Sequence, residues 1–370
     1  MTTGENSNDI QWLKACFIRG GTSKGVFFNA ADLPADRAER NALFCAMMGS
    51  PDPNGRQLDG MGGGISSLSK VMIVDTASDD EHDLTYTFAQ VAVDTTSVDY
   101  SANCGNLSSA IAPFALEAGL LTLPDGEHAV RLFNTNTSKT VIARLTVVGG
   151  RAQVHGDFAL PGVAGTGSPI TLEYPDPAGS RTSGLLPTGN ATDIVHDEGG
   201  DIEVSLVDAC LPMVFVRASD VNADPTQLSF DGTEVMARLE RIRAAGAKLM
   251  GMEPAQAAPK IAVVAPPTAA PLLDGTQLEA EGHDVLVRTL SMQKTHKAVP
   301  GTGAMCIAAA ASIKGGIIAE AIGSSELRSV RIGTPSGAVT AGARYDGNAL
   351  AATQLVRSAR ILMRGEVAAP

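Results

Sequence analysis

The chain alternates between short runs of β-branched or aromatic residues and turns that are rich in glycine. Typical runs are residues 70–74 (KVMIV), 85–93 (TYTFAQVAV), 140–148 (TVIARLTVV) and 260–265 (KIAVVA). Runs of this length, bounded by Gly, Pro, Asn and Asp, predict β-strands. The protein is therefore expected to consist mostly of strands, with a minority of helices.

Four segments predict helices. Residues 35–48 and 232–251 carry apolar residues at three-to-four spacing with charges opposite, which predicts helices on the outside of the fold. Residues 104–119 and 302–316 carry almost no charge on any face, which is typical of buried helices. The pattern indicates an α+β fold of two similar domains, in each of which strands wrap around one central buried helix.

The length of the chain also favours two domains, because 370 residues exceed the usual size of one hydrophobic core. The stretch 161–200 is rich in Gly, Pro, Ser and Thr and is expected to contain the linker. We place the N-terminal domain at residues 12–188, completed by a C-terminal strand at 352–368. The C-terminal domain, with the second buried helix, is placed at 189–351.

Charge and composition narrow the function classes. A formal net charge of −12 argues against nucleic acid or an anionic membrane as a partner. The polar N-terminus has no apolar core for a signal peptide, and the longest uncharged stretch, residues 298–313, is too short to cross a bilayer. The five cysteines lack CxxC spacing and no two histidines sit at ligand spacing, so we expect no metal site and a cytoplasmic location.

Cys104 occupies the predicted start of the first buried helix, next to Asn103, Gly105 and Asn106. The N-terminus of a helix presents unpaired N–H groups and the positive end of the helix dipole, and both favour anions and a thiolate. Position alone leaves two interpretations open, a catalytic thiol and a buried structural cysteine.

Several turns carry further candidate residues. The turn at 17–25 (FIRGGTSKG) lacks the spacing of a phosphate loop, so we interpret it as a turn that holds carboxylates. The loop 59–71 leads to Lys70 at the start of an apolar strand, and burial favours the neutral lysine that a general base requires, although a surface lysine is the simpler alternative. In the second half, His296 precedes the second buried helix, and a lone histidine there is more often structural.

The motifs together resemble the family of 2-methylaconitate cis–trans isomerases and 4-oxalomesaconate isomerases, within the diaminopimelate epimerase-like superfamily. The blocks that carry the resemblance follow one another in family order: RGGTSKG from residue 19, DGMGG from 59, NCGN from 103, PGTGA from 300 and TPSG from 334. The resemblance extends from about residue 16 to residue 365. It implies the two-domain fold described above.

The resemblance also implies a cofactor-independent isomerase that acts on small di- or tricarboxylates held in the interdomain cleft. Family members that shift an allylic double bond use a lysine and a cysteine, which match Lys70 and Cys104. Lys70 would remove a proton next to a carboxylate or carbonyl, and Cys104 would protonate the distal carbon of the dienolate. The residues expected to bind the substrate are Arg19, Thr22, Ser67, Asn103, Gly105, Asn106, His296, Thr302 and Ser336.

The sequence departs from the superfamily at informative positions. Two-thiol epimerases have a second cysteine at the start of the second helix, where this chain has Pro300, which argues against two-cysteine racemisation. Cys306 lies deeper in that helix and is expected to belong to the core. Thr334 stands where the family has histidine, and Gly64 and Leu68 differ from the common pattern, so the substrate cannot be transferred from any one relative.

Two alternative functions are also compatible with the sequence. One is cis–trans isomerisation of an aconitate without migration of the double bond. The other is a non-catalytic protein that binds polycarboxylates, which would have no use for both Lys70 and Cys104. A homodimer is compatible with the sequence but not indicated by it.

A first prediction concerns metals and cofactors. Because the sequence offers neither a metal-ligand spacing nor a dinucleotide fingerprint, isomerase activity should survive dialysis and treatment with EDTA. Turnover before and after chelation provides the measurement. Loss of activity that zinc or magnesium restores would contradict the metal-free interpretation.

Overall fold

The computed structural model describes residues 10–101, 103–255, 258–291 and 293–369. The chain forms two compact units: unit 1 contains residues 1–172 and 357–370, and unit 2 contains residues 173–356. The chain leaves unit 1 within β11 (Ile170–Pro175) and returns to it at the end of β22 (Ala349–Arg357). Among the described residues, every helix is too short or too polar to span a lipid bilayer.

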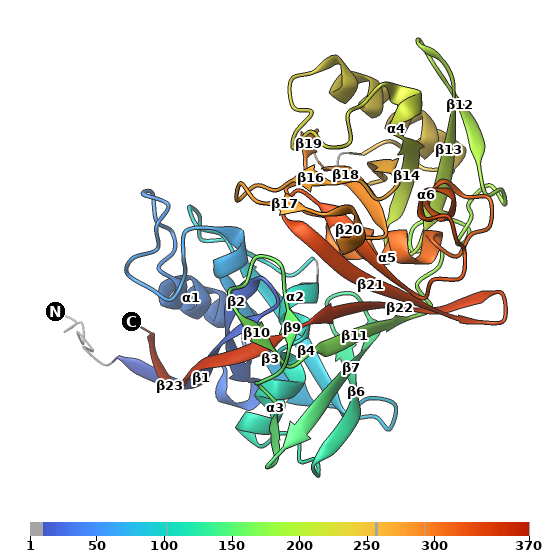
Figure 1. Ribbon diagram of the computed structural model, residues 1–370. Coiled ribbons are helices and arrows are strands. Elements are labelled where there is room, and N and C mark those ends of the chain that lie inside the picture. The colour runs from blue at the N-terminus through green and yellow to red at the C-terminus, as the bar shows by residue number, and fades with distance from the viewer. Residues whose placement is uncertain (1–9, 102, 256–257, 292, 370) are drawn as a thin grey trace. The chain divides into compact units, whose positions relative to one another are not determined.

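Unit 1, whose elements are labelled in Figure 1, is built around a sheet that has helices on both faces. Its helices are α1 (Arg37–Met48), α2 (Gly105–Ser108) and α3 (Ile111–Ala118), with short 3₁₀ turns η1 (Ala30–Asp32) and η2 (Ser66–Leu68). Its strands are β1 (Gln11–Gly20), β2 (Ser23–Asn29), β3 (Lys70–Thr76), β4 (Leu84–Val91), β5 (Val98–Asp99), β6 (Gly126–Asn134), β7 (Lys139–Val148), β8 (Arg151–Ala152), β9 (Phe158–Ala159), β10 (Thr166–Gly167) and β23 (Ala359–Ala369).

Two crossovers build unit 1. Strands β2 and β3 are parallel neighbours joined through α1, and β4 and β6 are parallel neighbours joined through α2 and α3. Successive residues of a strand face opposite sides of the sheet. Accordingly Phe28 stacks on Phe44 of α1 at 6.0 Å between ring centroids, whereas its neighbour Phe27 meets Phe114 of α3 at 5.6 Å. We call the α2–α3 side the inner face and the α1 side the outer face.

Unit 2 repeats this plan. Its helices are α4 (Glu234–Leu249), α5 (Gly301–Ala310) and α6 (Ile317–Ile322), with η3 (Ser219–Val221) and η4 (Ala280–Gly282). Its further strands are β12 (Asp193–Asp197), β13 (Gly200–Asp208), β14 (Pro212–Arg217), β15 (Lys260–Ala265), β16 (Ala270–Pro271), β17 (Gln277–Leu278), β18 (Val285–Ser291), β19 (Lys294–Thr295), β20 (Ser329–Thr334) and β21 (Gly337–Asp346). Parallel strands β14 and β15 are joined through α4, and parallel strands β18 and β20 through α5 and α6.

The core of unit 2 again has two sides. Met213 and Phe215 of β14 pack in the cluster around α5, which lies beside β20 and β21 in Figure 1. Val214 and Val216 pack on the opposite side, in the cluster with the apolar face of α4. Cys306 is fully buried in α5, and burial raises the pKa of its thiol. The predicted α+β architecture, with strands around a central buried helix, is confirmed.

The helices differ from their predicted lengths in a consistent way. The outer helices predicted at 35–48 and 232–251 are α1 and α4. The segment 104–119, by contrast, is two short helices with a break at Ser109 and Ala110. Pro113 explains the break, because its ring has no N–H to donate and would clash with the carbonyl four residues earlier, at Ser109. The segment 302–316 stops being helical after Ala310, and Gly315 adopts a left-handed conformation with φ of 79°.

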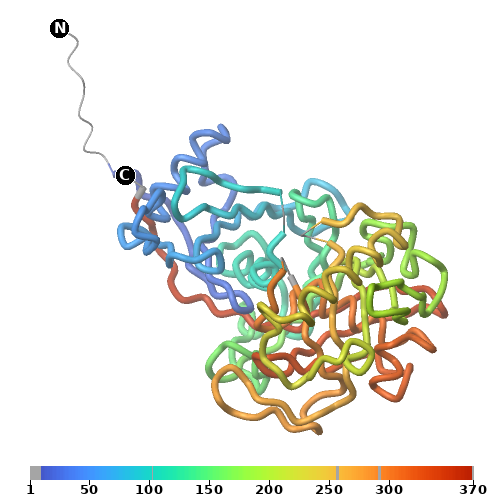
Figure 2. Tube along the Cα trace, turned by 90° about the horizontal axis from the view of Figure 1, so that it is seen from above, coloured from blue at the N-terminus to red at the C-terminus, as the bar shows by residue number. Residues whose placement is uncertain are grey.

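The end of the chain completes unit 1. β23 runs antiparallel to β1 with Gln11 opposite Ala369 and Gly20 opposite Ala359. Figure 2 shows these first and last described segments, in blue and red, side by side. The strand predicted from residue 352 onward as the completion of the N-terminal domain corresponds to the end of β22 and to β23.

The β1–β2 hairpin packs against α2 through glycines. A Cβ atom at Gly20 would lie 2.7 Å from the Asn106 carbonyl oxygen, and one at Gly25 would lie 2.7 Å from the Lys70 carbonyl oxygen. Both contacts are with backbone, which cannot move aside cheaply. The glycines of the RGGTSKG motif therefore set the distance from the hairpin to α2 and to the start of β3.

This contact yields a stability prediction. Gly25→Ala should destabilise unit 1 by about 1–3 kcal/mol, the usual cost of overpacking a tight interior. Gly184→Ala is the control, because a Cβ atom there meets nothing within 4 Å and the backbone is not left-handed. Urea unfolding of both variants provides the measurement, and equal stability of the two would contradict the packing argument.

Candidate active site

Asn106, in the first turn of α2, connects three parts of unit 1. Its side-chain Nδ2 donates to Thr22 Oγ1 at 3.1 Å, and its Oδ1 accepts from Nε of Arg357 at 3.1 Å. Gly21 packs directly on this side chain, since a Cβ atom there would lie 2.3 Å from Asn106 Oδ1. The structure thus brings Thr22 and Asn106 together and adds a cation, Arg357, that the sequence analysis missed.

Cys104 is the N-cap residue of α2 and its side chain is 8% exposed. Its carbonyl accepts from the Ser108 backbone N–H at 2.9 Å and from the Ser108 hydroxyl at 3.0 Å. Asn103 accepts from that hydroxyl at 3.2 Å and from the Tyr86 hydroxyl at 3.3 Å. Hydrogen bonds therefore hold the carbonyl of Cys104 and the side chain of the preceding Asn103.

The helix that begins at Cys104 is shorter than predicted, so its dipole is weaker than predicted. Because α2 has only four residues, few aligned peptide dipoles stand behind the thiol. The first N–H groups of the turn, at Gly105 and Asn106, still have no partner within the helix and can donate to an anion. The start of α2 therefore offers an anion two backbone donors, without the support of a long helix dipole.

Lys70 begins β3 and is 9% exposed. Its Nζ donates to Gln90 Oε1 at 2.6 Å and lies 4.7 Å from the centroid of the Phe88 ring. The orientation of Gln90 is fixed in turn, because its Nε2 donates to the Ser69 carbonyl at 2.8 Å. Lys70 is a buried, positioned lysine rather than the surface lysine of the simpler interpretation.

One strand connects the surroundings of Lys70 with those of Cys104. Tyr86, Phe88 and Gln90 alternate along β4 and therefore point to the same face of the sheet. Tyr86 bonds to Asn103 and Ser108 beside Cys104, whereas Phe88 and Gln90 contact Lys70 Nζ. Both candidate catalytic residues thus belong to the inner face of unit 1. Burial raises the pKa of Tyr86, so its hydroxyl stays protonated as a donor.

Arg19 occupies a different place from the other predicted residues of unit 1. Gly20 faces α2, so its neighbour Arg19 points to the outer face. Its guanidinium donates to the Ser358 carbonyl at 2.8 Å and the Gly21 carbonyl at 3.0 Å. Arg19 therefore holds the hairpin turn against the segment that precedes β23, and the structure does not group it with Cys104.

Ser67 lies in η2, at the end of the glycine-rich loop that leads to Lys70. This loop is organised by Gln57, whose Nε2 donates to Ser50 Oγ and Ser69 Oγ, both at 2.8 Å, while Oε1 accepts from the Gly64 N–H at 3.0 Å. Gly64 is left-handed with φ of 73°, and a Cβ atom there would meet the Gly55 carbonyl at 2.2 Å. The departure at Gly64 is thus a requirement of the loop.

In unit 2, the predicted residues gather around the start of α5. Ser336 Oγ donates to the Lys297 carbonyl at 2.6 Å, which ties the β20–β21 turn to the segment between His296 and α5. Thr302, in the first turn of α5, is exposed. Thr334, at the family's histidine position, is 1% exposed and its hydroxyl donates to the Gly337 carbonyl at 2.7 Å. Thr334 therefore closes the turn instead of facing a ligand.

A hydrogen bond to one ring nitrogen fixes the orientation of His296. Nδ1 accepts from the Ala298 backbone N–H at 3.0 Å, so the neutral ring carries its proton on Nε2 and can donate from there. Burial lowers the pKa of His296, and the charge of Lys260 lowers it further. The ring is therefore a neutral donor at physiological pH.

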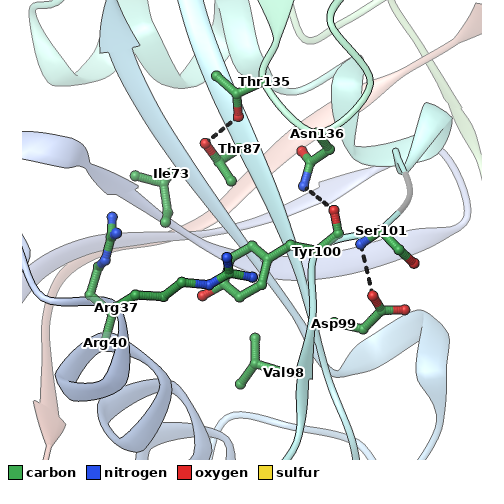
Figure 3. Close-up of a pocket in the computed structure, with 10 residues that line it drawn as sticks. All are labelled: Arg37, Arg40, Ile73, Thr87, Val98, Asp99, Tyr100, Ser101, Thr135 and Asn136. Carbon is green, nitrogen blue, oxygen red and sulfur yellow. Dashed lines mark hydrogen bonds between the residues drawn. The ribbon is translucent and has the colours of Figure 1, made fainter.

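One cavity of unit 1 contains none of the predicted residues. It measures about 580 Å³ and lies under α1 on the outer face. Figure 3 shows Arg37 and Arg40 of α1 beside Tyr100, and the Arg37 guanidinium lies 4.3 Å from the centre of that ring. Two polar pairs in its walls are hydrogen-bonded, Thr87–Thr135 and Asp99–Ser101. The buried Nε of Arg40 has no hydrogen-bond partner among the described residues. We do not assign the chemistry to this cavity.

Metal ligands do not gather in the structure: no group of three His, Cys, Asp or Glu side chains suited to an ion occurs among the residues described.

Comparison with known proteins decides the family. A family model described as PrpF protein matches residues 11–370. This chain belongs to the PrpF protein family. It is 40% identical to the 2-methyl-aconitate isomerase of Shewanella oneidensis over 96% of both chains, and 35% identical to the 3-methylitaconate isomerase of Eubacterium barkeri over 97% of this chain and 98% of that one.

A solved structure gives the same result. The crystal structure of a methylitaconate-delta-isomerase matches with a TM-score of 0.91 at 35% identity, covering 98% of this chain and 96% of that chain. The resemblance drawn from the sequence motifs, the fold class and the expectation of an isomerase are thereby confirmed.

Sequence reasoning missed several residues of this PrpF family member. Tyr86 and Gln90 follow the two-residue period of an inward strand face, and a glutamine on such a face needs a buried partner. Arg357 is a basic residue inside an apolar strand pattern. Each signal becomes readable only once β4 is paired with β3, Lys70 opposite Gln90, and β22 is known to lead to Asn106.

His283, which is buried, and His296, which is half-buried, give a pH prediction. Burial lowers the pKa of both His296 and His283 in the folded protein. Below the ordinary histidine pKa of about 6.5, the unfolded chain binds protons that the folded unit excludes. Stability is therefore fully present above about pH 6.5 and falls as the pH drops through the lowered values.

Urea unfolding at intervals between pH 7.5 and 5.5 tests this, a window in which most carboxylates stay ionised. The double change His283→Gln and His296→Gln should flatten the dependence. His155→Gln, which changes an exposed histidine of unit 1, is the control. A wild-type stability that rises on acidification would contradict the argument.

Proposed function

We propose that the chain moves a double bond within a small unsaturated di- or tricarboxylate by a 1,3 proton transfer, with Lys70 as the base and Cys104 as the acid. The observation that carries the proposal is β4, whose inner-face residues Tyr86, Phe88 and Gln90 reach both Lys70 Nζ and the turn that holds Cys104. A structural lysine or a structural cysteine would not require this shared support.

Each proton that is removed or added in this mechanism can be assigned to a named group. Neutral Lys70 removes a proton from the carbon next to a carboxylate, and the electron pair moves through the double bond to give a dienolate. The thiol of Cys104 then protonates the distal carbon. The Lys70 ammonium then loses a proton to solvent and the Cys104 thiolate takes one up. Both groups return to their starting forms, and no external oxidant or reductant is required.

Charge that develops on the dienolate needs donors in fixed positions. The backbone N–H groups of Gly105 and Asn106 supply such donors at the start of α2, and fixed dipoles aimed at developing charge are the largest catalytic term in many enzymes. Arg357 is a candidate for binding a substrate carboxylate, since its Nε already reaches Asn106. Thr22 and Asn103 complete the polar set on unit 1.

The substrate class follows from the relatives. Proteins named as isomerases of 2-methyl-aconitate and of 3-methylitaconate share this chain's length and fold. Both names describe branched unsaturated polycarboxylates with a proton beside a carboxylate. We therefore propose a methylaconitate, methylitaconate or oxalomesaconate type of substrate. His296, Thr302 and Ser336 of unit 2 and Ser67 remain predicted carboxylate-binding residues, and the homodimer and the cytoplasmic location remain predictions.

The two roles can be separated by mutation. Lys70→Met keeps similar bulk but removes the base, so both isomerisation and exchange of the substrate's acidic proton should stop. Cys104→Ser keeps the base and replaces the thiol with a far weaker acid. Its isomerisation should slow by about 10²–10⁴-fold, the range for a positioned acid, while proton exchange continues. Proton NMR in deuterated buffer with a panel of candidate substrates measures both reactions.

Matched controls are available in the same unit. Lys14→Met changes an exposed lysine of β1, and Cys45→Ser changes a buried cysteine of α1, so both should isomerise at the wild-type rate. If Cys104→Ser abolishes exchange while Lys70→Met retains it, the roles are reversed. Full activity of both site variants would refute the assignment of this chemistry to the inner face.

A further inference from the structure

Three cations stand side by side on the outer face of unit 1. In the register of the sheet, Arg19 of β1 lies directly opposite Lys24 of β2 on one side and Arg360 of β23 on the other. Residues in register on neighbouring strands point to the same face. The three side chains therefore form a row across β2, β1 and β23, and we call it the cationic row.

No carboxylate of the described residues forms a salt bridge with this row. Arg19 donates only to the Ser358 hydroxyl and to the carbonyls of Ser358 and Gly21, and Lys24 lies over the Phe17 ring at 5.6 Å. Like charges directly opposite one another on neighbouring strands destabilise a sheet. A protein with a net charge of −12 that keeps three such cations together carries an unbalanced local charge.

A cavity adjoins the row. It measures about 270 Å³ and is lined by all three cations and by apolar side chains, among them Phe158, Leu160 and Leu362. The β9–β10 hairpin forms its cover and contacts the tip of the β1–β2 hairpin, because a Cβ atom at Gly162 would lie 3.6 Å from Thr22 Cγ2. The site thus combines positive charge with an apolar wall in a small volume.

We propose that this cavity binds a small organic carboxylate, at a site separate from the inner face that holds Lys70 and Cys104. Guanidinium groups match the geometry of a carboxylate and bind it by paired charge-assisted hydrogen bonds. The volume lies just below the range of about 300–1,000 Å³ usual for small-molecule sites, which excludes nucleotides and favours an acid of a few carbons. The apolar wall favours an organic anion over inorganic phosphate or sulfate.

Succinate is a suitable probe because it has no double bond to isomerise. Hydrogen–deuterium exchange should show saturable protection of residues 158–167 in the wild-type protein. The double variant Lys24→Gln/Arg360→Gln should bind about tenfold or more weakly, because two charge-assisted contacts are lost. Arg364→Gln is the matched control, since Arg364 lies on the same strand but pairs with Glu117 on the inner face. Its binding should equal that of the wild type.

Stability of the ligand-free protein offers a second readout. Arg360→Gln removes one of the repelling cations, so it should raise Tm by about 1–3 °C at low salt while weakening the binding of succinate. A lower Tm would show that the cation serves the fold and would overturn the inference. The same conclusion follows if succinate gives no saturable protection, or if the double variant is protected like the wild type. Equal protection by phosphate or sulfate at matched ionic strength would overturn the assignment to organic carboxylates.

Discussion

The contact between the glycine hairpin and α2 is the constraint on which unit 1 depends. Gly20, Gly21 and Gly25 bring the backbone of β1 and β2 so close to α2 and β3 that a single added methyl group would overlap with main-chain or Asn106 atoms. Close approach of this kind fixes relative positions more firmly than long side chains do, since main-chain atoms have no alternative rotamers. This packing therefore determines the positions of Lys70 and Cys104.

The proposed chemistry would rely on side chains whose own positions are fixed by hydrogen bonds. Gln90 holds Lys70 and is itself held by the Ser69 carbonyl, whereas Ser108 and Tyr86 fix Asn103 next to Cys104. Orientation of catalytic groups by a second layer of contacts is what allows proton transfer without large rearrangement. The inner face is therefore a preorganised surface, and the outer face carries α1 and the cationic row.

The fold class could be predicted from the sequence, and Lys70 and Cys104 could be singled out as candidates, because these features have local signatures. Strand alternation, uncharged helices and the RGGTSKG and NCGN motifs can all be recognised without knowing which strands pair. The break at Ser109 was also readable in principle, from Pro113. The orientation of Arg19 was not, since one step along a strand reverses the face and the motif does not say which residue faces α2. The roles of Arg357 and Gln90 depend on contacts between distant segments, so their local patterns become readable only once those contacts are known.

Because β23 pairs with β1 along its whole length, unit 1 is assembled from segments that precede and follow the whole of unit 2 in the chain. During synthesis, the inner-face surroundings of Cys104 stay incomplete until Arg357 has emerged, by which time all of unit 2 is available to fold. Long-range pairing of this kind is slow to form and leaves the edge of β1 exposed to other chains in the meantime. Nascent chains, and chains truncated before β23, are thus the forms most exposed to aggregation.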